Sequence, residues 1–182
     1  MLMLLQAQHG AVRHQGKPST TAMSLPTSDE QYLQYAIRLA IEAERRGNLP
    51  IGAVVTFGGQ VISEGMNSIW KPSPDLTRHA EMEALRSLPS HLRPHAREMT
   101  LFTTLEPCLM CAGAILLHSI GRVVFGASDP FGGVLPSLHS LTPFFQDQFY
   151  RIQWQGPFSP ENCDPLYARV RELERQHERS SR

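Results

Sequence analysis

Residues 107–111 read Pro-Cys-Leu-Met-Cys, and they follow an apolar run, Met99–Thr104, that has the character of a buried strand. Proline is tolerated in the first turn of a helix, because an N–H group there has no intrahelical partner. The sequence therefore predicts a helix that begins near Pro107. Cys108 and Cys111 are three residues apart, which predicts that they lie about one turn apart on one face of that helix. The positive end of a helix favours thiolates, so the two cysteines are candidate metal ligands.

A second chemical motif, His79-Ala80-Glu81, stands at the start of another predicted helix, Arg78–Leu88. Two thiolates and one imidazole suit Zn²⁺, and three protein ligands leave a fourth position open, as in a catalytic zinc site. Two residues of helix turn through about 200°, so His79 and Glu81 cannot share a side of the helix but can share its end. If that end points at the metal, His79 can ligate while Glu81 takes a proton from water and passes it to a leaving nitrogen.

Each motif taken alone has other interpretations. A lone Cys-x-x-Cys could be a redox pair or half of a structural zinc site, and a lone His-x-Glu usually has no chemical meaning. A disulfide oxidoreductase would leave His79 and Glu81 without a role. Found together in this order, the two motifs favour an open catalytic zinc. Cys163 is the remaining cysteine, and we expect a packed or free thiol there rather than a fourth ligand.

Around these motifs, hydrophobic periodicity and turn residues predict alternating helices and strands. The chain is expected to open with a helix that Ser28 caps and Gly47 ends. Strands Ile51–Phe57 and Val61–Glu64 follow, joined by a turn at Gly58-Gly59. After the two motif helices we expect strand Arg122–Gly126, a Gly/Pro-rich stretch over Ala127–Pro143, a last strand over Tyr150–Gln155 and a final helix that begins at Asp164-Pro165. This order, α-β-β-α-β-α-β-(β)-α, predicts the α/β class and a three-layer α/β/α sandwich.

The composition of the chain excludes several classes of protein. The 182 residues suffice for one ordinary domain, and 41% hydrophobic residues exclude wholesale disorder. We expect residues 1–27 to be a disordered N-terminal extension and residues 28–182 to form the folded domain. Seventeen Lys and Arg balance seventeen Asp and Glu, so nucleic-acid binding would depend on a local patch. No apolar run reaches the ~20 residues of a membrane span, and three cysteines indicate a reducing, cytoplasmic setting.

Four stretches together resemble the zinc-dependent cytidine/deoxycytidylate deaminase superfamily and look most like bacterial tRNA adenosine deaminases. They are Thr104–Ile115 (TLEPCLMCAGAI), Ile120–Ala127 (IGRVVFGA), Pro50–Val55 (PIGAVV) and Glu64–Asn67 (EGMN). The resemblance covers roughly residues 29–140. It implies the cytidine-deaminase-like fold, a Zn²⁺ cofactor, a homodimer, and hydrolytic conversion of adenosine to inosine at the wobble position of a tRNA anticodon loop.

The resemblance also implies roles for single residues. His79, Cys108 and Cys111 match the family's zinc ligands, and Glu81 matches its proton shuttle. Asn67 matches an asparagine that contacts the bound nucleoside. The backbone N–H groups of Ala80 and Cys108 lie where the family's pocket is lined, and we expect Ala80 to contact the substrate. The chain departs from the family's pattern after Ala127, where Phe131 replaces a lysine and Pro136 replaces a second glycine. For a tRNA substrate, we expect phosphate contacts from Arg122, Arg151, Arg169, Arg171 and Arg175.

Two other functions stay open. One is deamination of a free nucleobase or nucleoside, such as guanine or cytosine, which suits a neutral protein with an altered loop. The other is a non-catalytic, zinc-stabilised partner subunit, although the intact Glu81 argues against it. A separate feature of the sequence also indicates a dimer: the predicted helical segment Ala112–Leu117 is apolar on nearly all sides. A helix of that kind is buried on more than one side, and one side could face a second subunit.

Overall fold

A five-stranded mixed sheet forms the centre of the computed structural model, which describes residues 29–180. The strands are β1 (Gly52–Phe57), β2 (Gln60–Met66), β3 (Thr100–Leu105), β4 (Arg122–Ala127) and β5 (Gln153–Gln155), in the spatial order β2-β1-β3-β4-β5. β1 runs antiparallel to both β2 and β3, whereas β3, β4 and β5 are parallel. β3 and β4 are buried along almost their whole length, which is the environment of parallel strands covered on both faces.

The first two strands form the predicted hairpin. Phe57 pairs with Gln60, so only two residues form the turn. Both of them, Gly58 and Gly59, have positive φ angles of 56° and 75°. A two-residue turn of this hand needs positive φ at both central positions, which glycine adopts without steric cost.

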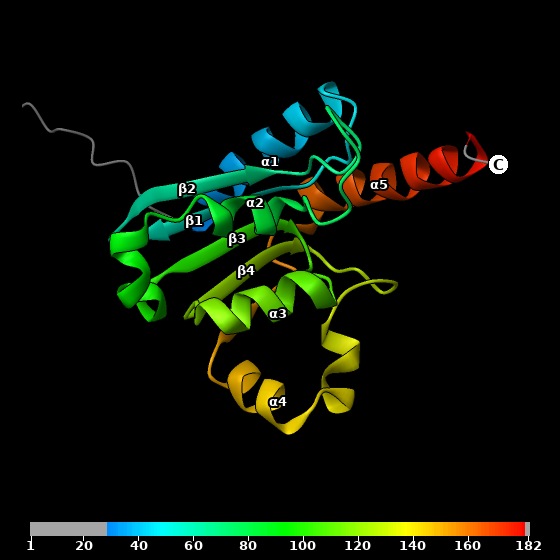
Figure 1. Ribbon diagram of the computed structural model, residues 1–182. Coiled ribbons are helices and arrows are strands. Elements are labelled where there is room, and N and C mark those ends of the chain that lie inside the picture. The colour runs from blue at the N-terminus through cyan, green and yellow to red at the C-terminus, as the bar shows by residue number, and fades with distance from the viewer. Residues whose placement is uncertain (1–28, 181–182) are drawn as a thin grey trace, which may run out of the picture.

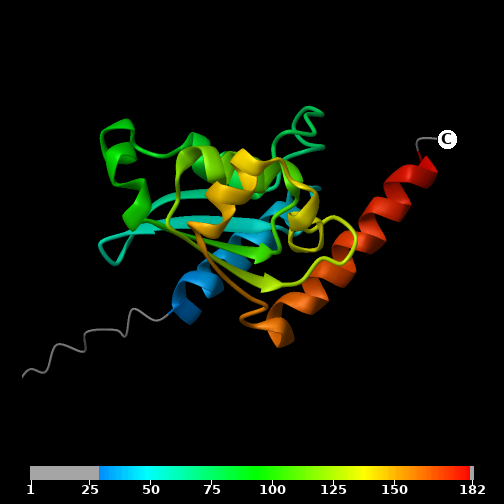
Figure 2. The ribbon, with the colours of Figure 1, turned by 90° about the horizontal axis from the view of Figure 1, so that it is seen from below.

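Helices cover both faces of the sheet (Figures 1 and 2). Helices α1 (Asp29–Arg45) and α5 (Pro160–Ser180) lie on one face, and α2 (Ala80–Arg86) and α3 (Leu109–His118) lie on the other. The short helix α4 (Pro143–Tyr150) packs outside α3, and two 3-10 helices span Ser90–Glu98 (η1) and Leu135–Ser140 (η2). The predicted three-layer α/β/α sandwich is confirmed. Each helix between residues 29 and 180 is too short or too polar to traverse a lipid bilayer.

The strand directions bring the two sequence motifs to the same edge. Because β2, β3 and β4 point the same way, their carboxyl ends share one edge of the sheet. The chain leaves β2 toward α2 and leaves β3 toward α3, so both helices begin near that edge. In α/β proteins, ligands bind beyond the carboxyl ends of the strands, and the motif residues stand at these two helix starts.

The expected start of the final helix was wrong. Helix α5 begins at Pro160, and Pro165 lies inside it. Ser159 precedes Pro160, and its carbonyl accepts the N–H of Cys163 while its hydroxyl donates to Glu161 Oε1 at 2.8 Å. A capping serine followed by proline at the first helical position is the same signal that was assigned to Asp164-Pro165. It occurs twice in this segment, and the first occurrence starts the helix.

Two other expectations need correction. The sequence predicted a Gly/Pro-rich stretch up to Pro143 and a strand from Tyr150, with no helix between them. In the structure, helix α4 lies there and begins after Thr142, with Pro143 as its first residue. Phe149 stacks on Trp154 with ring centroids 4.5 Å apart, and the last strand is accordingly confined to Gln153–Gln155. The expected extension over residues 1–27 and the cap at Ser28 lie outside the described residues.

Candidate active site

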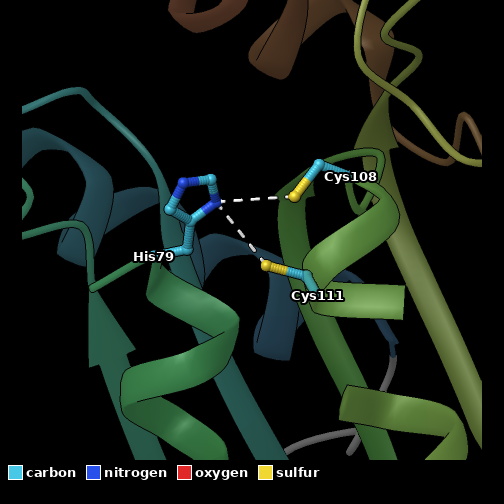
Figure 3. Close-up of side chains that lie close together, drawn as sticks. All are labelled: His79, Cys108 and Cys111. Carbon is cyan, nitrogen blue, oxygen red and sulfur yellow. Dashed lines mark hydrogen bonds between the residues drawn. The ribbon is translucent and has the colours of Figure 1, made fainter. Parts of the chain in front are cut away.

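Two helix starts face each other across the edge of the sheet (Figure 3). His79 precedes α2 and Cys108 precedes α3, both with extended backbone angles. Neither side chain makes the usual capping hydrogen bond to its own helix. Instead, His79 Nδ1 lies 3.6 Å from the Sγ atoms of both Cys108 and Cys111. Cys108 is thus a cap residue and not part of a helical face as expected, yet the two sulfurs converge on one imidazole.

These three donor atoms fit a zinc ion. All of them lie within 4.8 Å of one another. A tetrahedral zinc with Zn–N of about 2.0–2.1 Å and Zn–S of about 2.3 Å separates its nitrogen and sulfur donors by about 3.6 Å. That is the separation between His79 and each cysteine. One imidazole and two thiolates are also the borderline-to-soft donors that zinc prefers.

The pKa values of the two cysteine thiols are shifted in opposite directions. A hydrogen bond from Cys111, with a further contribution from His79, lowers the pKa of the Cys108 thiol to about 4. The hydrogen bond between the two sulfurs and burial raise the pKa of Cys111. Metal ligation requires both sulfurs as thiolates. Because the pKa of Cys111 is raised, metal binding has to displace its proton and strengthens as pH rises.

Glu81 lies directly beside the metal ligands. Its side chain is buried, Thr103 Oγ1 donates to its Oε1 at 3.3 Å, and Cys111 Sγ donates to its Oε2 at 3.5 Å. Burial raises the pKa of this carboxyl, because the charged form loses its hydration. A carboxyl with a raised pKa accepts and releases a proton closer to neutral pH. His79 and Glu81 share the end of α2, as the spacing of the motif requires.

Gly65 of β2 lets α2 approach the sheet closely. A Cβ atom at this position would lie 2.1 Å from the carbonyl oxygen of Ala80, far inside contact distance. Ala80 is fully buried as the first residue of α2. The absence of a side chain at Gly65 therefore sets how closely the start of α2, with His79 and Glu81, can approach strand β2.

Asn67, which follows β2, is fully buried beside the cavity. Its backbone N–H donates to Ile51, its Oδ1 accepts from the N–H of Ile69 at 3.3 Å, and both of these partners line the cavity. Its Nδ2 has no hydrogen-bond partner among residues 29–180. A buried amide donor without a partner is costly, which sets this side chain apart from the other buried polar groups around the cavity.

A cavity of about 460 Å³ opens above His79, Glu81 and Cys108. Its walls include apolar side chains, among them Phe131, and the polar side chain of Arg171, which was expected to contact phosphate. They also include four polar side chains that the sequence did not point to: Glu106, Asp129, Tyr167 and Glu174. Four carboxylates, including Glu81, face one guanidinium here. This charge balance disfavours an anionic ligand.

Glu106 fixes the loop at the mouth of this cavity. Its side chain is buried, and it accepts the backbone N–H groups of Asp129 at 3.1 Å and Leu135 at 2.9 Å. Cys108 also forms an isolated bridge with Gly133 in that loop. The signal available in the sequence was a carboxylate at the end of a buried strand, directly before the Pro-Cys pair.

Cys163 takes no part in the cluster of metal donors. It is a buried free thiol of α5, packed against Gly126 of β4. Burial raises its pKa to about 12, so it stays protonated at neutral pH. The expectation of a packed or free thiol is confirmed.

Most of the arginines expected to contact phosphates already have carboxylate partners. The pairs, with their shortest distances, are Arg122 with Asp29 at 2.5 Å, Arg151 with Asp147 at 2.8 Å, Arg169 with Glu44 at 2.6 Å and Arg171 with Glu174 at 2.5 Å. Within residues 29–180, Arg175 makes no ion pair. A polyanion would therefore have to compete with internal pairs at four of the five positions.

The sequence around this site matches the model of a known family. The model of the cytidine and deoxycytidylate deaminase zinc-binding region matches residues 26–127, which include all three metal donors and Glu81. The chain belongs to this family. It is accordingly a zinc-dependent deaminase, and zinc is the expected occupant of the His79, Cys108 and Cys111 cluster.

Individual proteins that resemble this chain include tRNA adenosine deaminases and a guanine deaminase. The deaminase is 42% identical over 119 residues to the tRNA-specific adenosine deaminase of Bacillus subtilis, a match that covers 63% of this chain and 71% of that protein. A solved tRNA:A34 deaminase is 35% identical, has a TM-score of 0.57, and is matched over 63% of this chain and 90% of that one. The guanine deaminase of Bacillus subtilis is 27% identical with a TM-score of 0.51, over 78% of this chain and 92% of that one.

Proposed function

We propose that this protein converts adenosine to inosine by hydrolysis, at the wobble position of a tRNA anticodon. The observation that carries the chemistry is the buried carboxylate of Glu81 beside three convergent metal donors at the floor of a cavity. The substrate follows from the identity of 42% to a tRNA-specific adenosine deaminase, against 27% to a guanine deaminase.

In this proposal, His79, Cys108 and Cys111 hold the zinc and Glu81 moves the protons. A zinc ion held by these residues would supply a water that is nucleophilic at neutral pH. Glu81 would accept a proton from this water and pass it to N1 of adenine as the oxygen bonds to C6. Glu81 would then move the remaining hydroxyl proton to the exocyclic nitrogen, so that the C6–N6 bond breaks, ammonia leaves and the base keeps a carbonyl at C6. Thr103 orients the carboxylate through its hydrogen bond to Oε1.

The walls of the cavity suit an uncharged base. The unpartnered Nδ2 of Asn67 would donate to an acceptor of the base. The backbone N–H of Ala80 belongs to the first turn of α2, where N–H groups have no intrahelical partner. The carboxylates of the cavity keep phosphates outside, so the nucleotide would enter base first. A loop base enters this way without the cost of unpairing a duplex.

The test supplies RNA and free compounds in parallel. Purified protein is incubated with an anticodon stem-loop that carries adenosine at the wobble position, and separately with adenosine, guanine and cytosine. We expect inosine and ammonia from the stem-loop and little product from the free compounds, because flanking nucleotides contribute binding energy that orients the base. Efficient deamination of guanine with an untouched stem-loop would instead establish the second candidate, which the likeness to a guanine deaminase favours. A zinc-loaded protein inactive on all four would indicate a non-catalytic partner subunit.

We also propose a cytoplasmic homodimer that meets through α3. One side of this helix, including Cys111 and Ile115, is buried in the chain, whereas Leu109 and Leu117 are 60% and 66% exposed. An apolar helix exposed on one side is typical of an interface. Sedimentation at micromolar concentration should give a dimer, and Leu117→Glu should shift it toward monomer. A monomeric wild-type protein would contradict the proposal.

A further inference from the structure

An aromatic side chain stands exposed at the mouth of the catalytic cavity. Phe131 is 79% exposed, although it lines the same cavity as His79 and Glu81. Single exposed apolar residues are common on protein surfaces, so exposure alone assigns no role. What sets Phe131 apart is the set of contacts that hold it.

Phe131 is fixed from two sides. Its backbone N–H donates to Asp129 Oδ1 at 3.0 Å, and the same oxygen accepts the Tyr167 hydroxyl at 2.9 Å, which ties the loop to α5. The guanidinium of Arg171 lies over the ring, with its Cζ 4.5 Å from the ring centroid. Arg171 is itself held by Glu174, since its Nη1 donates to Oε2 at 2.5 Å. The ring is thus positioned before any ligand arrives, with one face on a cation and the rest open to solvent.

The surroundings select the ligand. A phosphate would have to displace Glu174 from Arg171 and would face Asp129 and Glu81 across the cavity. A flat, neutral ring system meets neither obstacle. Nucleobases stack on aromatic and arginine planes when single-stranded RNA is bound. A base that stacks here would lie next to the base inside the cavity.

We propose that Phe131, backed by Arg171, is a stacking platform for the nucleobase adjacent to the one that is deaminated. The proposal rests on the proposed function, because only a polynucleotide substrate has an adjacent base. It makes Phe131 a specificity-determining residue that favours RNA over free nucleosides. It acts on substrate binding and leaves the chemistry at Glu81 unchanged.

The experiment compares variants at Phe131 on matched RNAs. Phe131→Ala removes the platform, Phe131→Leu keeps an apolar side chain without an aromatic face, and Phe131→Trp restores a face. Phe144→Ala is the matched control, since Phe144 is 57% exposed but lies on α4 away from the cavity. The RNAs are the anticodon stem-loop with adenosine at the wobble position and two versions with an abasic site, either 5′ or 3′ of that adenosine. Kd, KM and kcat are measured together with zinc content and Tm.

We expect Phe131→Ala and Phe131→Leu to raise Kd and KM by about 5- to 20-fold, the lower part of the range for base–aromatic stacking. The value of kcat, the zinc content and the Tm should stay near those of the wild type, and Phe131→Trp and Phe144→Ala should bind normally. On one of the two abasic RNAs, the penalty of Phe131→Ala should disappear.

Three results would overturn the stacking proposal: unchanged binding by Phe131→Ala, normal binding by Phe131→Leu, or the same penalty on both abasic RNAs. The proposed function fails separately, if wild-type protein binds the stem-loop without forming inosine. In that case the ratio of the Kd of each Phe131 variant to the Kd of the wild type still tests the stacking platform. A wild-type protein that does not bind the stem-loop at all would overturn both.

Discussion

Replacing Glu81 by glutamine tests the proposed proton shuttle separately from the metal site. Glutamine keeps the shape of the side chain, and its carbonyl oxygen can still accept from Thr103 Oγ1, which lies 3.3 Å from the carboxylate. The metal donors His79, Cys108 and Cys111 are untouched. A neutral amide is also cheaper to bury than a carboxylate, and the side chain is only 3% exposed. We therefore expect full zinc content and a Tm at or above that of the wild type.

The expected loss of activity is large because no neighbouring carboxylate is available to substitute. Glu106 is held by two backbone N–H groups, Asp129 by the Tyr167 hydroxyl and Glu174 by Arg171. General acid–base groups supply ~10²–10⁴-fold, and in the proposed mechanism Glu81 carries two proton transfers in each cycle. We expect kcat to fall by about 10⁴-fold, at the upper end of that range.

Inosine formation from the stem-loop measures this loss, and metal analysis of the same sample measures zinc. Glu83→Gln is the matched control, since Glu83 lies two residues further along α2 and pairs with Arg78 and Arg86 away from the metal donors. It should retain near-normal turnover. Zinc-loaded Glu81→Gln protein that works within tenfold of the wild type would refute the assignment of the shuttle.

Three further changes test the site and its supports. Cys108→Ser should lose most of the bound zinc and lower the Tm, because metal binding contributes to folding; full zinc content by metal analysis would contradict the ligand assignment. Gly65→Ala should cost about 1–3 kcal/mol in urea unfolding and weaken zinc binding, since its Cβ would meet a backbone oxygen, whereas Gly113→Ala, whose Cβ meets nothing within 4 Å, should be neutral or stabilising. Asp29→Asn should cost about 1 kcal/mol at pH 7. The hydrogen bond from Arg122 lowers the pKa of Asp29 in the folded protein, so this stabilisation is complete above the ordinary value of 3.8 and lost as pH falls below it. Unfolding curves of wild type and variant should converge in acid, and a difference that grows there would contradict the assignment.

The metal site could be predicted from the sequence because each of its parts is local. His79 and Glu81 occupy one helix start, and Cys108 and Cys111 occupy another, so two short motifs contain every donor. The alternation of helices and strands then places both helix starts at the carboxyl edge of one sheet. The metal site could therefore be predicted without knowing the strand register, the twist of the sheet or the lengths of the loops.

The walls of the cavity could not be predicted, because distant segments meet there through tertiary packing. Tyr167 and Arg171 lie about 40 residues beyond the loop that they contact, on a helix whose start was misplaced by five residues. The error at Pro165 had a physical cause, since two capping residues followed by proline compete within one segment. Helix α4 was missed for a similar reason. Its Phe149 is buried by Trp154, which comes later in the chain.

The departure of the loop from the family's pattern becomes intelligible only with α5 in place. Phe131 stands where the resemblance leads us to expect a lysine, and read in the sequence alone the change removes a positive charge from the mouth of the site. In the structure, Arg171 brings a guanidinium to 4.5 Å from the centre of that ring, so a positive charge remains at the mouth but is supplied by the helix. Because Glu174 neutralises this charge and the ring covers it, the position no longer offers a phosphate site. It offers a flat face instead. A double replacement, Phe131→Lys with Arg171→Leu, should therefore make RNA binding more sensitive to salt, since a phosphate contact depends on counterion release and a stacked base does not. An unchanged salt dependence of Kd would show that the charge at this position has no part in RNA binding.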